Sequence, residues 1–205
     1  MSIVVHVVDD DASFRAAIGR LLQAVGYDVV VHESANDLLR RPPDDARPNC
    51  ILLDIRMPGR SGLELQQHLH ESGSISPIIF LTGHGDIPTS VGAIKGGAED
   101  FLTKPVSKNM LVDAIERAAV KYDKTRDQRD RTRSLQALVA VLTPRERQVF
   151  QCVAQGKTNK EIAGALGTTE RTVKAHRQKV MEKLKARSVP ELVLVAERLG
   201  LLSEV

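Results

Sequence analysis

The sequence has no tryptophan, only 3% aromatic residues and two cysteines among its 205 residues. Any hydrophobic core must therefore be mainly aliphatic. Cys50 and Cys152 stand far apart within apolar stretches, which favours buried free thiols in a reducing compartment over a disulfide. No apolar stretch reaches the roughly 18 residues that a transmembrane helix needs, and the N-terminal region MSIVVHVVDDD lacks the basic segment of a signal peptide. We therefore expect a cytoplasmic protein without a membrane partner.

Charge is unevenly divided along the chain. Residues 1–122 carry 12 Lys and Arg against 16 Asp and Glu, a net charge of −4, whereas residues 123–205 carry 17 against 10, a net charge of +7. An acidic half followed by a basic half predicts two domains with different partners, and a basic domain is typical of nucleic-acid binding. We place the first domain at residues 1–122, a charged linker at 123–137 and the second domain at 138–205.

The first domain alternates short apolar segments with amphipathic ones. Nearly solid aliphatic segments occur at Ile3–Val8, Cys50–Leu53 and Pro77–Thr82, and two shorter ones lie at Tyr27–His32 and in EDFLTKP. Apolar residues at helical spacing follow each of them. Five such strand–helix units predict a parallel sheet that is covered by helices on both faces, an α/β fold.

Polar and charged residues follow four of the predicted strands at their carboxyl ends: Asp9, Asp10 and Asp11 after the first, Asp54 after the third, Thr82 after the fourth and Lys104 after the fifth. Parallel α/β sheets bind ligands at this edge. Carboxylates gathered there raise one another's pKa values. A hard cation such as Mg²⁺ or Mn²⁺, helped by Lys104, would relieve the repulsion. The alternative is a set of unrelated, solvated loop acids.

The linker segment KYDKTRDQRDRTR, Lys121–Arg133, has nine charged residues among 13 and almost nothing to bury. Asp127 and Arg131 stand four residues apart in the order that supports a helix. We favour a helical extension of the preceding helix over a flexible connection.

The second domain carries helix-start signals. Capping boxes at Thr143–Glu146, Thr158–Glu161 and Ser188–Glu191 precede apolar residues at helical spacing, which predicts a small domain of four helices. Within it, NKEIAGALGTTERTVKAHRQKVMEKL predicts a helix-turn-helix. Its second helix presents a polar, basic face that suits a DNA major groove, formed by Arg171, Lys174, Ala175, Gln178 and Lys179. The alternative is a merely solvated basic face.

The motifs VVDDD, LLDIRMPGRSG, FLTGHGD and FLTKP, in this order and spacing, resemble the receiver domain of bacterial two-component response regulators. The resemblance covers about residues 1–122 and implies a flavodoxin-like fold with strand order 2-1-3-4-5. It implies that Asp54 is the phosphoacceptor, that Thr82 and Lys104 hold the phosphoryl oxygens, and that Phe101 is a switch aromatic. The Lys104–Pro105 peptide is expected to be cis.

The same resemblance implies a set of Mg²⁺ ligands. These are Asp10, Asp54 and the main-chain carbonyl of Arg56, with Asp9 and Asp11 contributing through water. His84, in TGHGD, is interpreted as a packing or specificity residue without a catalytic role.

The stretch from LTPRERQVF to LKARS resembles the four-helix DNA-binding domain of the LuxR/NarL family, and TGHGDIP favours its FixJ-like branch. The resemblance implies a recognition helix at about Glu170–Leu184, with Lys174, Ala175 and Gln178 nearest the base edges. It implies phosphate contacts from Lys157, Thr158, Asn159, Lys160, Thr172 and Lys179. The last helix, about Val189–Leu199, corresponds to the dimerisation element of the family.

We therefore predict a transcription regulator that is switched by phosphorylation. A sensor histidine kinase would phosphorylate Asp54, and the protein would form a homodimer and bind paired half-sites in promoter DNA, with RNA polymerase as a further partner. The predicted receiver interface uses Val91, Lys95 and Asp100, an apolar contact flanked by opposite charges. The chain would not be an enzyme, apart from Mg²⁺-dependent phosphoryl transfer to itself and slow dephosphorylation.

Two other classes of protein remain as alternatives. An aspartyl-phosphate phosphatase of the dehalogenase type would require an Asp-x-Asp nucleophile motif on the first strand together with a cap domain, a combination that we do not find. A stand-alone receiver would only relay phosphate, and the basic helical half argues against it.

Overall fold

The computed structural model describes residues 3–83 and 87–202, so that His84 lies outside the described residues. The chain forms two compact units, Met1–Arg126 and Asp127–Val205, and each is described by itself. The first unit is an α/β domain and the second is entirely helical.

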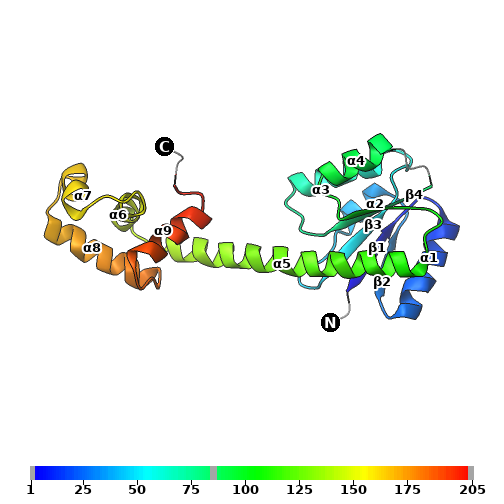
Figure 1. The fold of residues 1–205 in the computed structure, drawn as a ribbon, viewed down its shortest axis with the longest axis horizontal. Helices are drawn as coiled ribbons and strands as arrows, with labels where there is room; N and C mark the ends of the chain where they lie inside the picture. Colours follow the sequence, from blue (N-terminus) through cyan, green and yellow to red (C-terminus); the bar gives the residue numbers. More distant parts are fainter. Residues whose placement is uncertain (1–2, 84–86, 203–205) are drawn as a thin grey trace. The chain divides into compact units, whose positions relative to one another are not determined.

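A five-stranded parallel sheet forms the centre of the first unit (Figure 1). Its strands are β1 (Val4–Val8), β2 (Asp28–His32), β3 (Asn49–Leu53), β4 (Ile78–Thr82) and β5 (Asp100–Thr103). They lie in the order β2-β1-β3-β4-β5, which confirms the predicted flavodoxin-like topology. Every residue of β3 and β4 is buried, as expected for central strands that carry helices on both faces.

Helices cover the two faces of the sheet in separate layers. The first layer contains α1 (Ala12–Val25) and the first part of α5 (Lys108–Ala140), and the second contains α2 (Ala35–Arg40), α3 (Gly62–Glu71) and α4 (Ile87–Lys95) (Figure 1). Because side chains alternate along a strand, Cys50 and Leu52 of β3 pack in the first layer and Ile51 and Leu53 in the second. The core between the sheet and each helix layer is mainly aliphatic, as the composition predicts.

The loop that joins β3 to α3 is held close to the carboxyl end of β3. A Cβ atom at Gly62 would lie 2.2 Å from the main-chain oxygen of Asp54, so only glycine fits there. Ser61 is the N-cap of α3 and forms a capping box with Glu64 that sequence inspection had not singled out. The start of α3 is therefore fixed directly beside Asp54.

The second unit contains α6 (Pro144–Ala154), α7 (Asn159–Leu166), α8 (Glu170–Lys183) and α9 (Val189–Arg198). The predicted capping boxes of Thr143 and Thr158 are confirmed. The box predicted at Ser188 is wrong: the Ser188 side chain makes no capping hydrogen bond, and Glu191 Oε2 accepts from the amide of Arg187 at 2.8 Å instead of from that of Ser188. Gly167, with a φ of 60°, ends α7 in the left-handed conformation that the tight turn requires.

The charged segment Lys121–Arg133 is helical throughout and belongs to α5. Its only fully buried residue is Tyr122, whose hydroxyl donates to the main-chain oxygen of Asp45 at 2.8 Å. Both cysteines are free thiols, and no helix among the described residues has the length and apolarity to cross a membrane.

Candidate functional site

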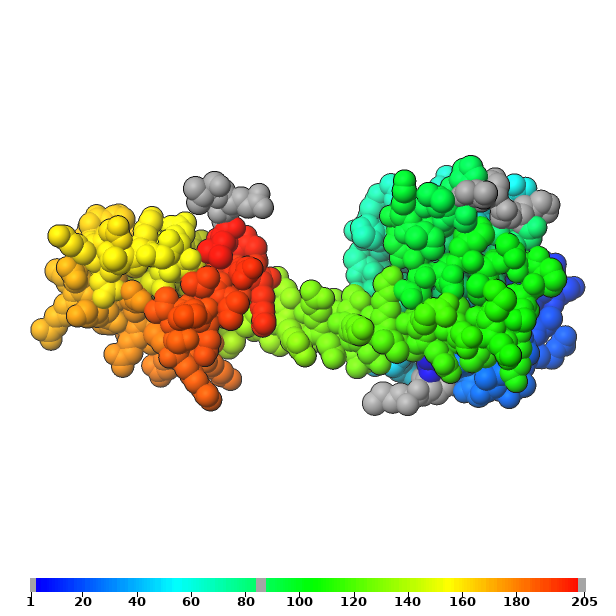
Figure 2. Space-filling model, in the orientation of Figure 1, coloured from blue at the N-terminus to red at the C-terminus, as the bar shows by residue number. Residues whose placement is uncertain are grey.

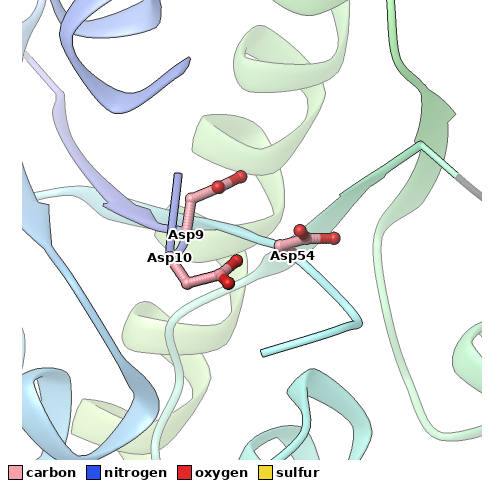
Figure 3. Close-up of side chains that lie close together, drawn as sticks. All are labelled: Asp9, Asp10 and Asp54. Atoms are coloured by element: carbon pink, nitrogen blue, oxygen red, sulfur yellow. The ribbon is translucent and has the colours of Figure 1, made fainter. Parts of the chain in front are cut away.

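Three carboxylates meet at the carboxyl edge of the sheet, where β1 and β3 end side by side. Val8 pairs with Leu53, so Asp9 and Asp54 follow neighbouring residues of adjacent strands. One carboxylate oxygen from each of Asp9, Asp10 and Asp54 lies within 4.8 Å of the others, and Figure 3 shows the three side chains gathered there. Asp9 is 2% exposed and Asp54 is 9% exposed, while Asp10 faces solvent. Two buried acids and one open acid thus share a small volume.

Lys104 brings a positive charge into this acidic cluster. It follows β5, where its amide donates to the main-chain oxygen of Thr82 at 2.8 Å and its peptide bond to Pro105 is cis. The Lys104 Nζ atom donates to Asp9 Oδ2 at 2.5 Å and to Asp54 Oδ2 at 3.2 Å. The side chain is 18% exposed, so the two ion pairs are only weakly screened by solvent.

The electrostatics of the cluster favour added positive charge. Burial raises the pKa of Asp9, while hydrogen bonds from Lys104 and from the amide of Asp11 oppose that rise. Asp54 accepts from the amide of Ile55 at 2.7 Å through its other oxygen. Several carboxylates with one ammonium among them leave a net negative site, and oxygen donors of this kind are the ligands that Mg²⁺ prefers. The arrangement can therefore bind a hard divalent cation.

The remaining predicted receiver residues lie around this cluster. Thr82 is buried at the end of β4, and the Phe101 ring is half-buried with its centroid 6.4 Å from that of Phe80. Arg56 is exposed in the loop after β3. Asp11 is the N-cap of α1, because its Oδ1 accepts from the amides of Ser13 and Phe14.

In the second unit, α8 has the two faces that its sequence predicts. Val173 and Val180 are fully buried. The residues predicted to face DNA are all exposed, and they are Arg171, Lys174, Ala175, Gln178 and Lys179.

Most of the residues predicted to contact phosphates lie at or near the starts of α7 and α8, whereas Lys179 lies in the second half of α8. Lys157 and Lys160 are exposed, and Thr158 caps α7. Asn159 is already engaged: its Oδ1 accepts from Arg177 Nη1 at 2.7 Å, which ties the start of α7 to α8. The Thr172 hydroxyl lies 2.9 Å from that of Thr169.

A partly buried ion pair between α6 and α8 was missed by sequence reasoning. Glu146 is 3% exposed, and its Oε2 accepts from Lys183 Nζ at 2.6 Å and from the amide of Thr143 at 2.8 Å. The hydrogen bond from Lys183, followed by that from the Thr143 amide, lowers the pKa of Glu146 to about 2. The capping box signals the local role of Glu146, but no pattern in the sequence points to a partner 37 residues away. The pair fixes the end of α8 against the start of α6.

Of the predicted interface residues, Val91 and Lys95 lie on α4 and Asp100 lies on β5. Helix α4 belongs to the green region of the first unit in Figure 2. Val91 and its neighbour Ile94 are 45% and 48% exposed, and Lys95 is also exposed. Asp100 is not isolated, because it forms an ion pair with Arg117 of α5. Ile94 and Arg117 were not anticipated from the sequence.

Each of the two units matches a known protein family. Residues 5–116 match the response regulator receiver domain, and residues 140–196 match the bacterial regulatory proteins of the luxR family. Nodulation protein W of Bradyrhizobium diazoefficiens is 43% identical over 198 residues, covering 97% of this chain and 87% of that protein. Transcriptional regulatory protein FixJ of Azorhizobium caulinodans is 42% identical over 195 residues, covering 95% and 92% of the two chains.

Solved structures agree with these matches over nearly the whole chain. The low-resolution structure of response regulator StyR is 42% identical with a TM-score of 0.77, covering 97% of this chain and all of that one. The crystal structure of full-length FixJ from B. japonicum is 37% identical with a TM-score of 0.57, covering 98% of both chains. The chain therefore belongs to the LuxR/NarL family of two-component response regulators and is a DNA-binding response regulator.

Proposed function

We propose that Asp54 accepts a phosphoryl group from a phosphohistidine of a sensor histidine kinase. The observation that carries the proposal is the position of Lys104 Nζ, 3.2 Å from Asp54 Oδ2 at the open edge of the sheet. A carboxylate oxygen of Asp54 would attack phosphorus and form the new P–O bond. The P–N bond would break, and its electron pair would return to the imidazole nitrogen, which then takes up a proton. Thr82 and Lys104 would hold the phosphoryl oxygens.

The acidic cluster has the donor set for Mg²⁺ or Mn²⁺, because three carboxylate oxygens lie within 4.8 Å of one another. Asp10, Asp54 and the main-chain carbonyl of Arg56 would bind the ion, and Asp9 would contribute through water. Asp11 would do the same only through Oδ2, since its Oδ1 caps α1. The bound ion supplies positive charge against the oxygens of the transferred group.

Phosphorylation would change the α4 surface through Thr82 and Phe101 and produce a homodimer. Val91 and Lys95 on α4 would meet the same residues of a second chain around a two-fold axis, where a self-complementary patch is required. Asp100 would face Lys95 of the other copy, although it would have to share its carboxylate with Arg117. Helix α9 would pair the DNA-binding units.

The dimer would bind paired half-sites in promoter DNA in the cytoplasm and act on transcription together with RNA polymerase. Lys174, Ala175 and Gln178 would reach base edges, because they lie on the exposed face of α8, and Arg171 would bind DNA from the same face. The phosphate contacts would be Lys157, Thr158, Asn159, Lys160, Thr172 and Lys179. Asn159 would position its neighbours through its bond to Arg177.

Labelling the protein with acetyl phosphate and Mg²⁺ tests the phosphoacceptor. We expect one phosphoryl group per chain in the wild type and none in Asp54→Asn, measured by intact mass. Asp10→Ala should raise the Mg²⁺ concentration needed for half-maximal labelling. Asp113→Asn changes an exposed carboxylate on α5 and is the matched control, which should label like the wild type. Full labelling of Asp54→Asn would contradict the assignment.

A further inference from the structure

The ammonium group of Lys104 has a third contact besides its two carboxylates. Its Nζ atom lies over the ring of Phe14, 4.0 Å from the ring centroid. An ammonium group has three N–H donors, and two of them point at Asp9 and Asp54. The face of an aromatic ring carries negative electrostatic potential and attracts a cation at this distance. Lys104 is thus held by two acids and one ring.

The position of Phe14 is determined by the start of α1. Its amide donates to Asp11 Oδ1 at 3.1 Å, so the N-cap places Phe14 in the first turn, directly after the acidic motif. Arg15 Nη1 donates to the main-chain oxygen of Asp9 at 2.6 Å, which ties the same turn to the end of β1. The Phe14 ring also packs against the core between α1 and α5. The Phe14 ring is therefore held in place by its surroundings, whereas a lysine side chain such as that of Lys104 is intrinsically flexible.

We propose that Phe14 is a positioning residue that holds the Lys104 ammonium toward Asp54 and shields it from water. The inference rests on the proposed phosphorylation of Asp54. Without the ring, the third N–H would be hydrated and the ammonium would sample orientations that point away from Asp54. A smaller share of molecules would then have Lys104 in place when the phosphoryl group arrives. The strength of cation–π contacts corresponds to a rate lowered by about 2- to 30-fold.

The kinetic test compares the rates at which acetyl phosphate with saturating Mg²⁺ labels four proteins. Phe14→Leu removes the ring and should label more slowly by the stated factor, whereas Phe14→Tyr keeps a ring and should label within a factor of about two of the wild type. Leu21→Ala is the packing control, since Leu21 packs on the same core from the same helix. It should lower thermal stability without slowing labelling. Phe14→Met replaces Phe14→Leu if the latter is unfolded at the assay temperature by far-UV circular dichroism.

A second readout follows Lys104 itself, with neither Mg²⁺ nor phosphodonor present. Protons above the face of an aromatic ring are shifted upfield, so the Lys104 Hε resonances should lie upfield of those of the other lysines in ¹³C-lysine spectra. The Lys104→Arg spectrum identifies them by their loss. Phe14→Leu should return these resonances to the usual position, and Phe14→Tyr should keep them upfield. A mere loss of packing would not reproduce this pattern.

The two levels of the proposal fail in different ways. If the wild type is not labelled, or if Asp54→Asn is labelled equally, the proposed function is wrong. If Asp54 is labelled but Phe14→Leu reacts as fast as the wild type, Phe14 has no positioning role. Lys104 Hε resonances without an upfield shift in the wild type would overturn the inference as well, even if no variant folds.

Discussion

Acidification from pH 7.5 to 5.0 should destabilise the first unit through a pair of buried histidines that the proposed chemistry does not use. His6 of β1 and His32 of β2 are 5% and 0% exposed, and their rings stack with centroids 5.3 Å apart. His6 Nδ1 lies 3.0 Å from His32 Nε2. At this distance one nitrogen donates and the other accepts, so the two rings cannot both be protonated while they keep this contact.

Of the charges that face this pair, Arg41 lowers the pKa of His32 and Asp37 raises it, and burial tips the balance toward the neutral ring. Asp37 Oδ2 lies 3.5 Å from His32 Nδ1, which is too long for a strong hydrogen bond. Asp37 is also paired with Arg40 and Arg41, and the bond from Arg41 is the main reason that its pKa is lowered. Burial, with His32 adding to it, lowers the pKa of His6 from 6.5 to about 4. Burial, followed by Arg41, lowers the pKa of His32.

The direction of the effect follows from proton binding. Between its folded pKa of about 4 and its unfolded value of 6.5, His6 takes up a proton only in the unfolded chain. The unfolded state then binds more protons, so the free energy of unfolding falls as the pH falls. Each pH unit in this window is worth about 1.4 kcal/mol, so at pH 5.0 the loss through His6 is up to about 2 kcal/mol. Water that reaches the rings reduces this loss of unfolding free energy. Above the unfolded pKa of 6.5, His6 causes no such loss.

Urea unfolding at both pH values, followed by tyrosine fluorescence, measures this loss. Tyr27 and Tyr122 are the two tyrosines of the chain, and both belong to the first unit, so the signal reports that unit alone. We expect the wild-type midpoint to fall by about 1 M more than that of His6→Val between the two pH values. His68→Ala removes an exposed imidazole and should parallel the wild type.

Comparing pH differences removes the contributions that wild type and variant share. Asp9, whose pKa is raised by burial, opposes the loss equally in both proteins. His6→Val will also lower stability at pH 7.5, because His32 loses its partner, but that cost does not depend on the titration of His6. Equal pH-induced losses in wild type and His6→Val would refute the reasoning, since the buried pair would then take up protons as easily as the unfolded chain.

Two further predictions concern the proposed interfaces. Lys174→Ala should weaken binding to the specific duplex by about 1–3 kcal/mol and spare scrambled DNA, whereas Lys179→Ala should weaken both and lower the salt slope by about 1. Titrations at several salt concentrations measure this, and the reverse pattern would exchange the two roles. Lys95→Glu should leave the phosphorylated protein monomeric by light scattering, whereas Lys108→Glu, at the exposed start of α5, should not. An unchanged phospho-dimer in Lys95→Glu would place the interface elsewhere.

The features that were predictable from the sequence are those with a local cause. Solid aliphatic segments ending in acids predicted buried parallel strands, because strands covered on both faces have no polar side. The capping boxes of Thr143 and Thr158 formed because each needs only four consecutive residues.

The features that were not predictable depend either on a choice between adjacent backbone donors or on a partner further along the chain. Ser188 has the sequence of a capping box, yet Glu191 bonds to the amide of Arg187, a choice that the sequence pattern cannot distinguish. The predicted interface used Asp100 as an available surface charge, although Asp100 forms an ion pair with Arg117 of α5. Such pairs depend on how helices pack against strands, and periodicity does not encode that packing.

The order of the strands in the sheet determines which residues at the strand ends come into contact. β1 lies between β2 and β3, so the residues at its end meet different partners on its two sides. Toward β3, the pairing of Val8 with Leu53 brings Asp9 beside Asp54. Toward β2, Val8 pairs with His32, and His6, two residues earlier, projects from the same face of the sheet. Periodicity alone leaves His6 as a single polar residue in an aliphatic strand, whereas the order 2-1-3 makes it half of a buried pair.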